Sequence, residues 1–173
     1  MNLVDIKNYI RDIPDFPKKG IIFRDITPLL NNHKVFKFVV DSLTQFFETK
    51  NVKKILSIEA RGFIFGSTVA YRLGCGFVPV RKKGKLPYKT ISIEYELEYG
   101  KDVLEIHEDA ISPQENVAII DDVLATGGTS YAVAKLVEKC EAKVVGLGFV
   151  VELTYLNPRQ KLKEYEIFSL VKY

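Results

Sequence analysis

Short apolar runs alternate with amphipathic segments along this chain of 173 residues. Because the runs are apolar on both faces and rich in β-branched residues, they indicate strands buried within a parallel sheet. They occupy residues 55–58, 77–80, 117–120, 144–151 and 167–171. Apolar residues recur every three or four positions in 3–13, in 36–47 and after Gly127-Gly128, which predicts helices there. Strands that alternate with helices predict an α/β fold, with a mostly parallel central sheet flanked by helices.

Residues 91–106 follow another pattern. Ile91, Ile93 and Tyr95 alternate with polar neighbours, and a second apolar stretch follows Tyr99-Gly100-Lys101. This arrangement predicts an antiparallel hairpin that edges or projects from the sheet. The length of the chain suits one domain over residues 1–173.

Composition excludes several classes of protein. No apolar run approaches the roughly 18 residues that a membrane helix needs, and no signal peptide is visible, so we expect no membrane association. Two cysteines, Cys75 and Cys140, make no disulfide framework and favour the cytoplasm. The net charge of +3 is too small to argue for nucleic-acid binding. His33 and His107 have no spacing that suits zinc.

The most informative segment is 117–129, where an apolar strand runs into Asp121 and Asp122 and a glycine-rich turn opens a helix. The turn from Thr126 to Thr129 can direct backbone N–H groups and hydroxyls at a phosphate, while the carboxylates can accept hydrogen bonds from a sugar diol. An ordinary capped helix after a βα loop is the alternative, but the adjacent acids favour a sugar-phosphate site. The segment is no nucleotide P-loop, because the motif G-x-x-x-x-G-K-[ST] occurs nowhere in the sequence.

Two further segments carry charge near predicted strand ends. Glu59-Ala60-Arg61-Gly62 offers a guanidinium and loop N–H groups to a pyrophosphate, and a surface ion pair between Glu59 and Arg61 is an equally good interpretation. The run 81–85 holds four cations in five residues. A solvated loop is its usual explanation, and an RNA-binding patch is weak because no aromatic residues interleave the cations. Phe23 can stack on a purine, although a core phenylalanine is the common alternative.

These segments resemble the type I phosphoribosyltransferase family. Segment 117–129 is similar to its signature for 5-phosphoribosyl-1-pyrophosphate, which some transcriptional regulators share. Segments 16–30, 59–66, 81–87 and 97–101 look like the base-binding hood, pyrophosphate loop and flexible loop of the adenine-specific members. The resemblance spans nearly the whole chain, in order. It implies a hood over residues 1–32 and a flexible catalytic loop over 81–106.

The resemblance also implies a role for each matching residue. The phosphoribosyl group would bind at Asp121, Asp122, Ala125, Thr126, Gly127, Gly128 and Thr129. The pyrophosphate would bind at Glu59, Ala60, Arg61, Gly62, Arg81, Lys82 and Lys85. Adenine would bind at Ile22, Phe23 and Arg24. Glu98 would be the catalytic residue that handles the proton of the purine, with ordering of the loop as its structural alternative.

The activity implied is transfer of a 5-phosphoribosyl group to adenine, which gives AMP and pyrophosphate in purine salvage. The resemblance further implies a homodimer and a Mg²⁺ cofactor carried by the substrate near Asp121 and Asp122, with no residue assigned as a direct ligand. A transferase for another purine base and a non-enzymatic regulator that senses the same sugar phosphate are the alternatives. The regulator is disfavoured because residues 1–20 are too short for a helix-turn-helix unit.

Overall fold

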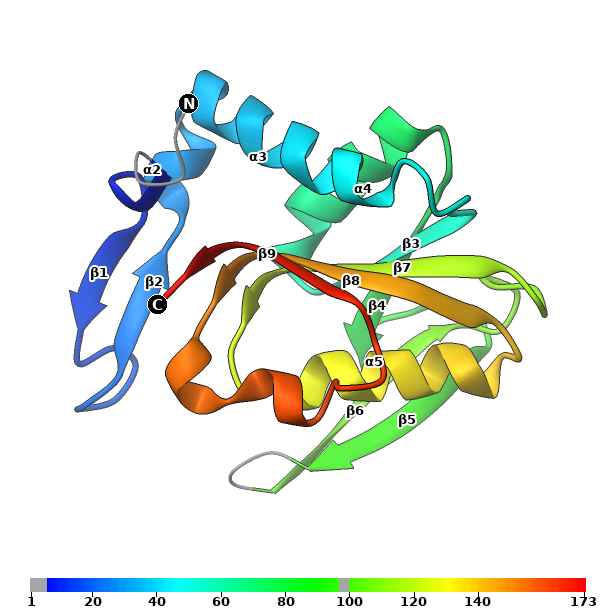
Figure 1. Cartoon of the computed structure of the whole chain (residues 1–173). Helices are drawn as coiled ribbons and strands as arrows, with labels where there is room; N and C mark the ends of the chain where they lie inside the picture. The colour runs from blue at the N-terminus through cyan, green and yellow to red at the C-terminus, as the bar shows by residue number, and fades with distance from the viewer. Residues whose placement is uncertain (1–5, 97–99) are drawn as a thin grey trace.

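The computed structural model describes residues 6–96 and 100–173. Its centre is a seven-stranded sheet with the order β5-β6-β4-β3-β7-β8-β9 (Figure 1). The strands are β3 (Lys54–Ile58), β4 (Gly76–Lys82), β5 (Thr90–Glu96), β6 (Lys101–His107), β7 (Asn116–Leu124), β8 (Lys143–Glu152) and β9 (Ile167–Lys172). Strands β4, β3, β7, β8 and β9 pair in parallel, whereas β6 pairs antiparallel with β4 and with β5. The predicted parallel sheet and antiparallel hairpin are both confirmed.

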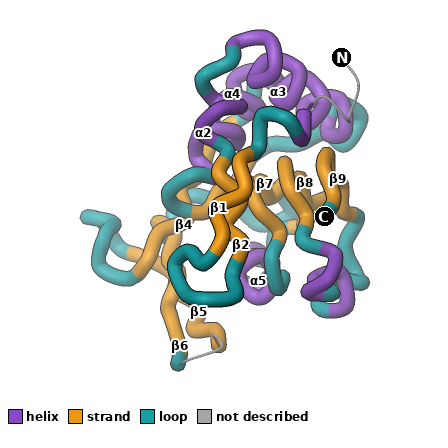
Figure 2. Tube along the Cα trace, turned by 90° about the vertical axis from the view of Figure 1, so that its left-hand side faces the viewer, coloured by secondary structure: helices purple, strands orange, loops and turns teal. Residues whose placement is uncertain are grey.

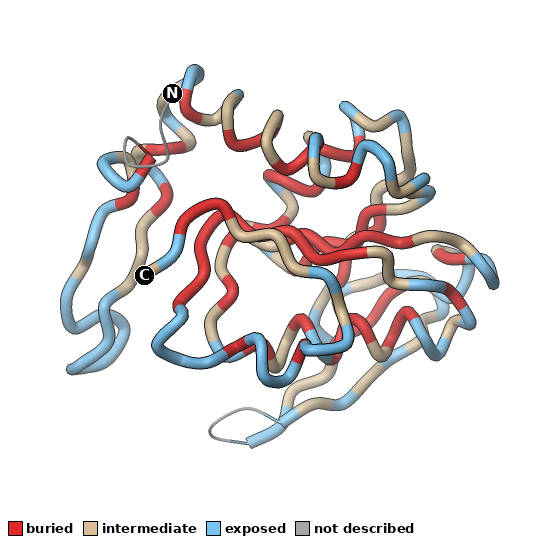
Figure 3. Tube along the Cα trace, in the orientation of Figure 1, coloured by how far each residue is buried: buried red, intermediate tan, exposed pale blue. Residues whose placement is uncertain are grey.

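Helices cover both faces of this sheet. Helices α3 (His33–Phe47) and α4 (Gly62–Leu73) lie on one face, and α5 (Gly128–Lys139) lies on the other (Figure 1). Successive residues of β7 divide between the two layers: Val117 and Ile119 pack with α5, while Ala118 and Ile120 pack with α3 and α4. All four are fully buried, and the buried parts of the chain gather at the sheet in Figure 3. This two-sided burial explains why the predicted strands are apolar on both faces.

Helix α3 shows how the pattern determines the structure. Its apolar residues Val35, Val39, Leu43 and Phe47 are four positions apart and almost fully buried. Each such side chain contributes about 1.5–3 kcal/mol by leaving water. The helix begins where the Asn32 side chain accepts hydrogen bonds from two backbone N–H groups of the first turn.

The prediction of one helix over residues 3–13 is wrong at its end. Residues Arg11–Pro14 form strand β1, which pairs antiparallel with β2 (Ile22–Asp25) and sets Ile13 opposite Phe23. Pro14 disfavours a helical backbone at the preceding residue, and β2 supplies the partner strand. With the short helix α2 (Thr27–Leu30), these strands make the hood, which lies beside the ends of β7 and β8 in Figure 2.

Two short 3₁₀ helices, η1 (Thr154–Leu156) and η2 (Pro158–Gln160), follow β8. None of the helices in the described part of the chain is long and apolar enough to span a membrane.

Candidate active site

A cavity of about 410 Å³ lies at the carboxyl ends of β3, β4, β7 and β8, with the hood forming one wall. Ligands of open α/β sheets bind at this edge. The predicted site residues that line it are Ile22, Phe23, Arg24, Glu59, Ala60, Arg61, Lys82, Asp121, Asp122, Ala125 and Thr129. The other described residues of the prediction are absent from its lining; they are Gly62, Arg81, Lys85, Thr126, Gly127 and Gly128. The structure therefore brings together four segments that are separate in the sequence.

The acid pair lies within β7 rather than after it, because this strand continues to Leu124. Asp122 is only 4% exposed, and its Oδ2 lies 2.8 Å from Nε of Arg61. Oδ1 of Asp121 accepts the Asp122 N–H at 2.9 Å. Burial, followed by the charge of Asp122, raises the pKa of Asp121 well above its usual value. Burial also raises the pKa of Asp122, although Arg61 opposes the effect.

The beginning of α4 touches the acid pair. A Cβ atom on Gly62 would lie 2.6 Å from Oδ1 of Asp121 and 3.3 Å from the carbonyl oxygen of Ile120. Any larger residue would push the helix away from β7. Glycine at the end of the Glu59–Gly62 loop thus allows the loop and the acid pair to share one cavity.

Glu59 forms ion pairs, but not with Arg61. Its carboxylate accepts hydrogen bonds from the Lys82 N–H at 3.0 Å and from Nε of Arg81 at 2.9 Å, and Nζ of Lys85 lies 3.0 Å away. Burial acts to raise the pKa of Glu59, but these three hydrogen bonds outweigh it and lower the pKa. The interpretation of Glu59 and Arg61 as a surface ion pair is therefore wrong, since Arg61 pairs with Asp122 across the cavity.

Lys82 is a cation of the basic run that lines the cavity itself. Its Nζ lies 2.9 Å from Oδ2 of Asp102 on β6, and this contact raises the pKa of Lys82 and lowers that of Asp102. Arg81, Lys82 and Lys85 thus pair with carboxylates of the same chain, and residues 82–85 are also exposed to solvent, as in the alternative interpretation.

The loop before α5 has the geometry of an open helix N-terminus. Gly127 directly precedes the helix with φ at +78°, and no side chain of the described residues caps the helix. A Cβ on Gly127 would lie 2.7 Å from the carbonyl oxygen of Pro158, so the position requires glycine for space as well as for conformation. Uncapped N–H groups at a helix start are free to bind an anion. The alternative of a loop whose side chain simply caps the helix is not supported.

The hood presents an aromatic ring and a guanidinium to the cavity. The ring of Phe23 has the Arg61 guanidinium 4.9 Å from its centroid, and Phe16 packs edge-on at 5.2 Å. Phe23 is half-buried and lines the cavity, so it is not the core residue of the alternative interpretation. Arg24 lies beside it, and its Nε is buried without a hydrogen-bond partner among the described residues.

Several lining residues were not predicted, among them Tyr95 of β5, Leu104 of β6 and Leu153 after β8. Burial raises the pKa of Tyr95, whose hydroxyl hydrogen-bonds Thr129. The signal for Tyr95 was its place in the alternating series with Ile91 and Ile93. The predicted catalytic Glu98 lies outside the described residues.

Among the described residues that line the cavity, Asp121 and Asp122 are the carboxylates we consider as ligands for a metal ion. Within residues 6–96 and 100–173, no group of three or more His, Cys, Asp or Glu residues could hold a metal ion. The two carboxylates of Asp121 and Asp122 at the cavity offer hard oxygen donors, and Mg²⁺ is commonly held by one or two carboxylates together with substrate phosphates. The donor set therefore fits a Mg²⁺ ion that arrives with a phosphorylated substrate.

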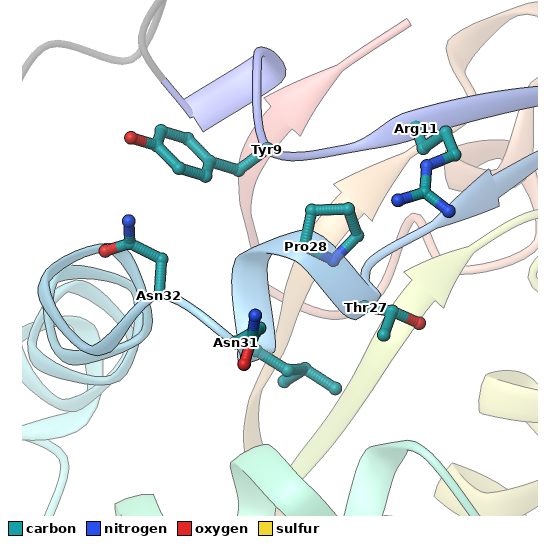
Figure 4. Close-up of a pocket in the computed structure, with 7 residues that line it drawn as sticks. Tyr9, Arg11, Thr27, Pro28, Asn31 and Asn32 are labelled. Atoms are coloured by element: carbon teal, nitrogen blue, oxygen red, sulfur yellow. The ribbon is translucent and has the colours of Figure 1, made fainter.

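A second hollow, of about 640 Å³, lies on the hood between Tyr9, Arg11 and the residues around Asn31 (Figure 4). None of the predicted site residues within the described part of the chain lines it. It is therefore separate from the candidate active site.

Comparison with known proteins agrees with the sequence resemblance. A family model described as a phosphoribosyl transferase domain matches residues 25–172. The adenine phosphoribosyltransferase of Thermotoga petrophila is 56% identical over 170 residues, which cover 98% of this chain and 100% of that protein. The adenine phosphoribosyltransferase of Thermosipho melanesiensis is 58% identical over 170 residues, which cover 98% of this chain and 97% of that protein.

Solved structures give the same result. The adenine phosphoribosyltransferase of Thermoanaerobacter pseudethanolicus is 55% identical and superposes with a TM-score of 0.96. The match covers 99% of this chain and 100% of that one. The enzyme of Saccharomyces cerevisiae, in complex with an imino-altritol bisphosphate and adenine, is 41% identical with a TM-score of 0.91, covering 97% of both chains.

Proposed function

Since the chain belongs to the phosphoribosyltransferase family and, within it, to the adenine phosphoribosyltransferases, we propose that the 410 Å³ cavity is its active site. The enzyme transfers the 5-phosphoribosyl group of 5-phosphoribosyl-1-pyrophosphate to adenine and releases AMP and pyrophosphate, a reaction of purine salvage. One observation carries the assignment of the site: the hood, the Glu59–Gly62 loop and the acid pair line one cavity although they are far apart in sequence.

The reaction forms a bond between N9 of adenine and the anomeric carbon, and it breaks the bond from that carbon to pyrophosphate. No protein nucleophile is needed, because the work is to align base and sugar and to stabilise charge on the leaving group. Asp121 and Asp122 line the cavity, which supports a role for them as acceptors of hydrogen bonds from the ribose hydroxyls. The N–H groups at the start of α5, near Thr126 and Thr129, suit the 5-phosphate.

The cations around Glu59 suit the pyrophosphate. Arg61 lines the cavity. Arg81 and Lys85 are not among the lining residues, but both pair with Glu59, which lines it. Arg81 and Lys85 can reach a pyrophosphate by turning N–H groups from Glu59 toward the substrate, and Lys82 by turning from Asp102. Turning away weakens the pairing of these protein carboxylates, so a multiply charged anion, which accepts charge-assisted hydrogen bonds from several cations at once, suits the site better than a neutral ligand.

The hood suits adenine. The S. cerevisiae relative, 41% identical, was solved with adenine bound, which supports a base site in this fold. Phe23 offers a face for stacking, and the backbone at Ile22 offers polar groups to the edge of the base. Arg24 lines the cavity, and N–H groups of its guanidinium can serve as donors for a ring nitrogen of the purine, since each ring nitrogen without hydrogen is an acceptor.

We further propose Mg²⁺ as the cofactor, held by Asp121 or Asp122 together with oxygens of the substrate. When bound, it lowers the negative charge of the departing pyrophosphate. Arg61 would support this binding of Mg²⁺, because its ion pair with Asp122 keeps the Asp122 carboxylate oriented toward the cavity.

A homodimer and a cytoplasmic location are part of the proposal. The exposed surface of α4 carries Ile64 at 37% and Tyr71 at 87% exposure, apolar groups of the kind that subunit interfaces cover. Both cysteines are free thiols, as expected in a reducing compartment.

Formation of AMP from labelled adenine and 5-phosphoribosyl-1-pyrophosphate tests the function. Hypoxanthine and guanine serve as control bases, and assays with and without Mg²⁺ test the cofactor. We expect AMP with adenine only, and only with Mg²⁺. Equal rates with hypoxanthine would overturn the adenine assignment, and no product with any base would overturn transferase activity.

A further inference from the structure

An aromatic residue outside the cavity contacts the guanidinium that lines it. The guanidinium carbon of Arg24 lies 3.7 Å from the centroid of the Tyr173 ring, the distance of a close cation–π contact. Tyr173 follows β9, whereas Arg24 belongs to β2 of the hood. In Figure 1 the end of the chain lies beside β2, away from the other hood strand. Tyr173 is not among the residues that line the cavity, and its ring contacts the lining through Arg24.

Tyr173 is held firmly by the main body of the protein. Its N–H donates to the carbonyl oxygen of Glu152 at 3.0 Å, and its own carbonyl accepts from the N–H of Thr154 at 2.9 Å. The hydroxyl of Thr154 donates to the same carbonyl. Glu152 is itself 2% exposed and bound through both carboxylate oxygens to Arg159, at 2.7 and 2.8 Å. The ring therefore projects from a fixed point at the end of the sheet.

Arg24, by contrast, has few other restraints. Its Nη1 pairs with Asp12, the residue directly opposite it in the hood hairpin. That contact ties Arg24 to the hood but not to the sheet. The Arg24 side chain is only 10% exposed, and its Nε has no partner within the described part of the chain. Without the Tyr173 ring, one face of the guanidinium would lose its support.

We propose that Tyr173 is a positioning residue for adenine binding: its ring holds the Arg24 guanidinium against the wall of the cavity and joins the hood to the end of β9. A second hood cation supports this function of the ring, since Nζ of Lys7 lies 4.7 Å from the same centroid. The inference rests on the proposed role of Arg24 in adenine binding and deepens it. It assigns part of the affinity for the base to a residue that does not touch the base.

The test replaces Tyr173 by leucine, which keeps apolar bulk without a π face, and by phenylalanine, which keeps the face. We expect Tyr173→Leu to raise the KM for adenine about 3- to 30-fold, the range of a partly to fully desolvated cation–π contact. The KM for 5-phosphoribosyl-1-pyrophosphate and kcat at saturating adenine should change less than about twofold. Tyr173→Phe should restore the KM for adenine to near the wild-type value.

Tyr155→Leu is the matched control, because Tyr155 is a nearby exposed tyrosine on η1 and does not line the cavity. Its kinetic constants should equal those of the wild type. The inference is overturned if Tyr173→Leu and Tyr173→Phe have the same KM for adenine, or if the KM values for both substrates rise together, as general loss of structure would cause. A wild-type protein that makes no AMP would instead contradict the proposed function, so the two failures are distinguishable.

Discussion

Replacing Asp122 by asparagine removes the charge from one side of the Arg61–Asp122 ion pair while keeping the size of the side chain. In the structure this carboxylate is 4% exposed and 2.8 Å from the guanidinium. The substitution removes the charge that we assign to the ribose hydroxyls and also frees Arg61 from its partner. Asp121→Asn, in contrast, removes a neighbouring carboxylate and leaves the Arg61–Asp122 pair in place.

The size of the effect follows from the contact. The Arg61–Asp122 contact is an ion pair in which Oδ2 of Asp122 accepts no hydrogen bond from the described residues. The hydrogen bond at stake is the one that we assign from a ribose hydroxyl to this carboxylate, and a hydrogen bond to a charged group contributes about 1.5–3 kcal/mol. The Arg61 side chain is 40% exposed, so solvent screens this pair and we take about 1–2 kcal/mol. That range corresponds to a loss of about 5- to 30-fold in kcat/KM for 5-phosphoribosyl-1-pyrophosphate. The KM for adenine should change little, because the hood supplies that binding.

The assay is steady-state kinetics of four variants: Asp121→Asn, Asp122→Asn, Arg61→Gln and the double variant Asp122→Asn/Arg61→Gln. The two residues of the pair should be coupled, so the double variant should lose less than the sum of the two single losses. Asp41→Asn is the control: Asp41 pairs with Arg72 at 3.1 Å on the outer surface of α3 and α4, and its loss should leave the kinetics unchanged. Unchanged kcat/KM for the donor in both Asp121→Asn and Asp122→Asn would refute the assignment of the acid pair.

Further predictions concern the basic run, the catalytic glutamate and pH. Arg81→Ala and Lys85→Ala should each weaken affinity for the donor and for pyrophosphate about tenfold and leave the KM for adenine unchanged, as isothermal titration and kinetics can show; equal loss for adenine would indicate a distorted loop instead. Glu98→Gln should lower kcat by about 10²–10⁴-fold with adenine binding kept if Glu98 moves the proton, whereas a wild-type pH–rate profile would leave it only a structural role. The raised pKa of Asp121 means that the folded state holds its proton more tightly than the unfolded state, so stability falls as pH rises above the ordinary value of 3.8. Asp121→Asn should therefore have a higher melting temperature than the wild type at neutral pH, and the difference should shrink in acid. If calorimetry finds no such difference, the raised pKa of Asp121 is contradicted.

The sequence predicts the sheet well because burial on both faces leaves a visible pattern. Residues 117–120 are apolar at every position, and the structure places them alternately against α5 and against α3 and α4. The hood was predicted less well. Its first strand carries apolar residues at helical spacing, and the partner that makes it a strand, β2, lies across a turn. The Asp12-Ile13-Pro14 sequence held the only local signal for an extended backbone.

Pairing of charges was the least predictable part of the site. Glu59 and Arg61 are two residues apart, which made an ion pair between them plausible, yet each finds a partner on another segment. Those partners depend on which strands are neighbours. β3 lies between β4 and β7, so the loop after β3 meets Arg81 on one side and Asp122 on the other. Spacing along the chain carries no information about such contacts, whereas the sheet order determines them.

The same sheet order explains how one loop can serve two halves of a substrate. The loop after β3 joins β4 and its cations to β7 and its acids, because these two strands flank β3. Arg61 reaches toward the acid pair and Glu59 reaches toward the basic run, so the two side chains of one loop point toward different strands. A donor with a sugar at one end and a pyrophosphate at the other has its charges divided in the same way. Gly62 completes the arrangement, since a side chain there would separate α4 from Asp121 and move the loop away from both partners.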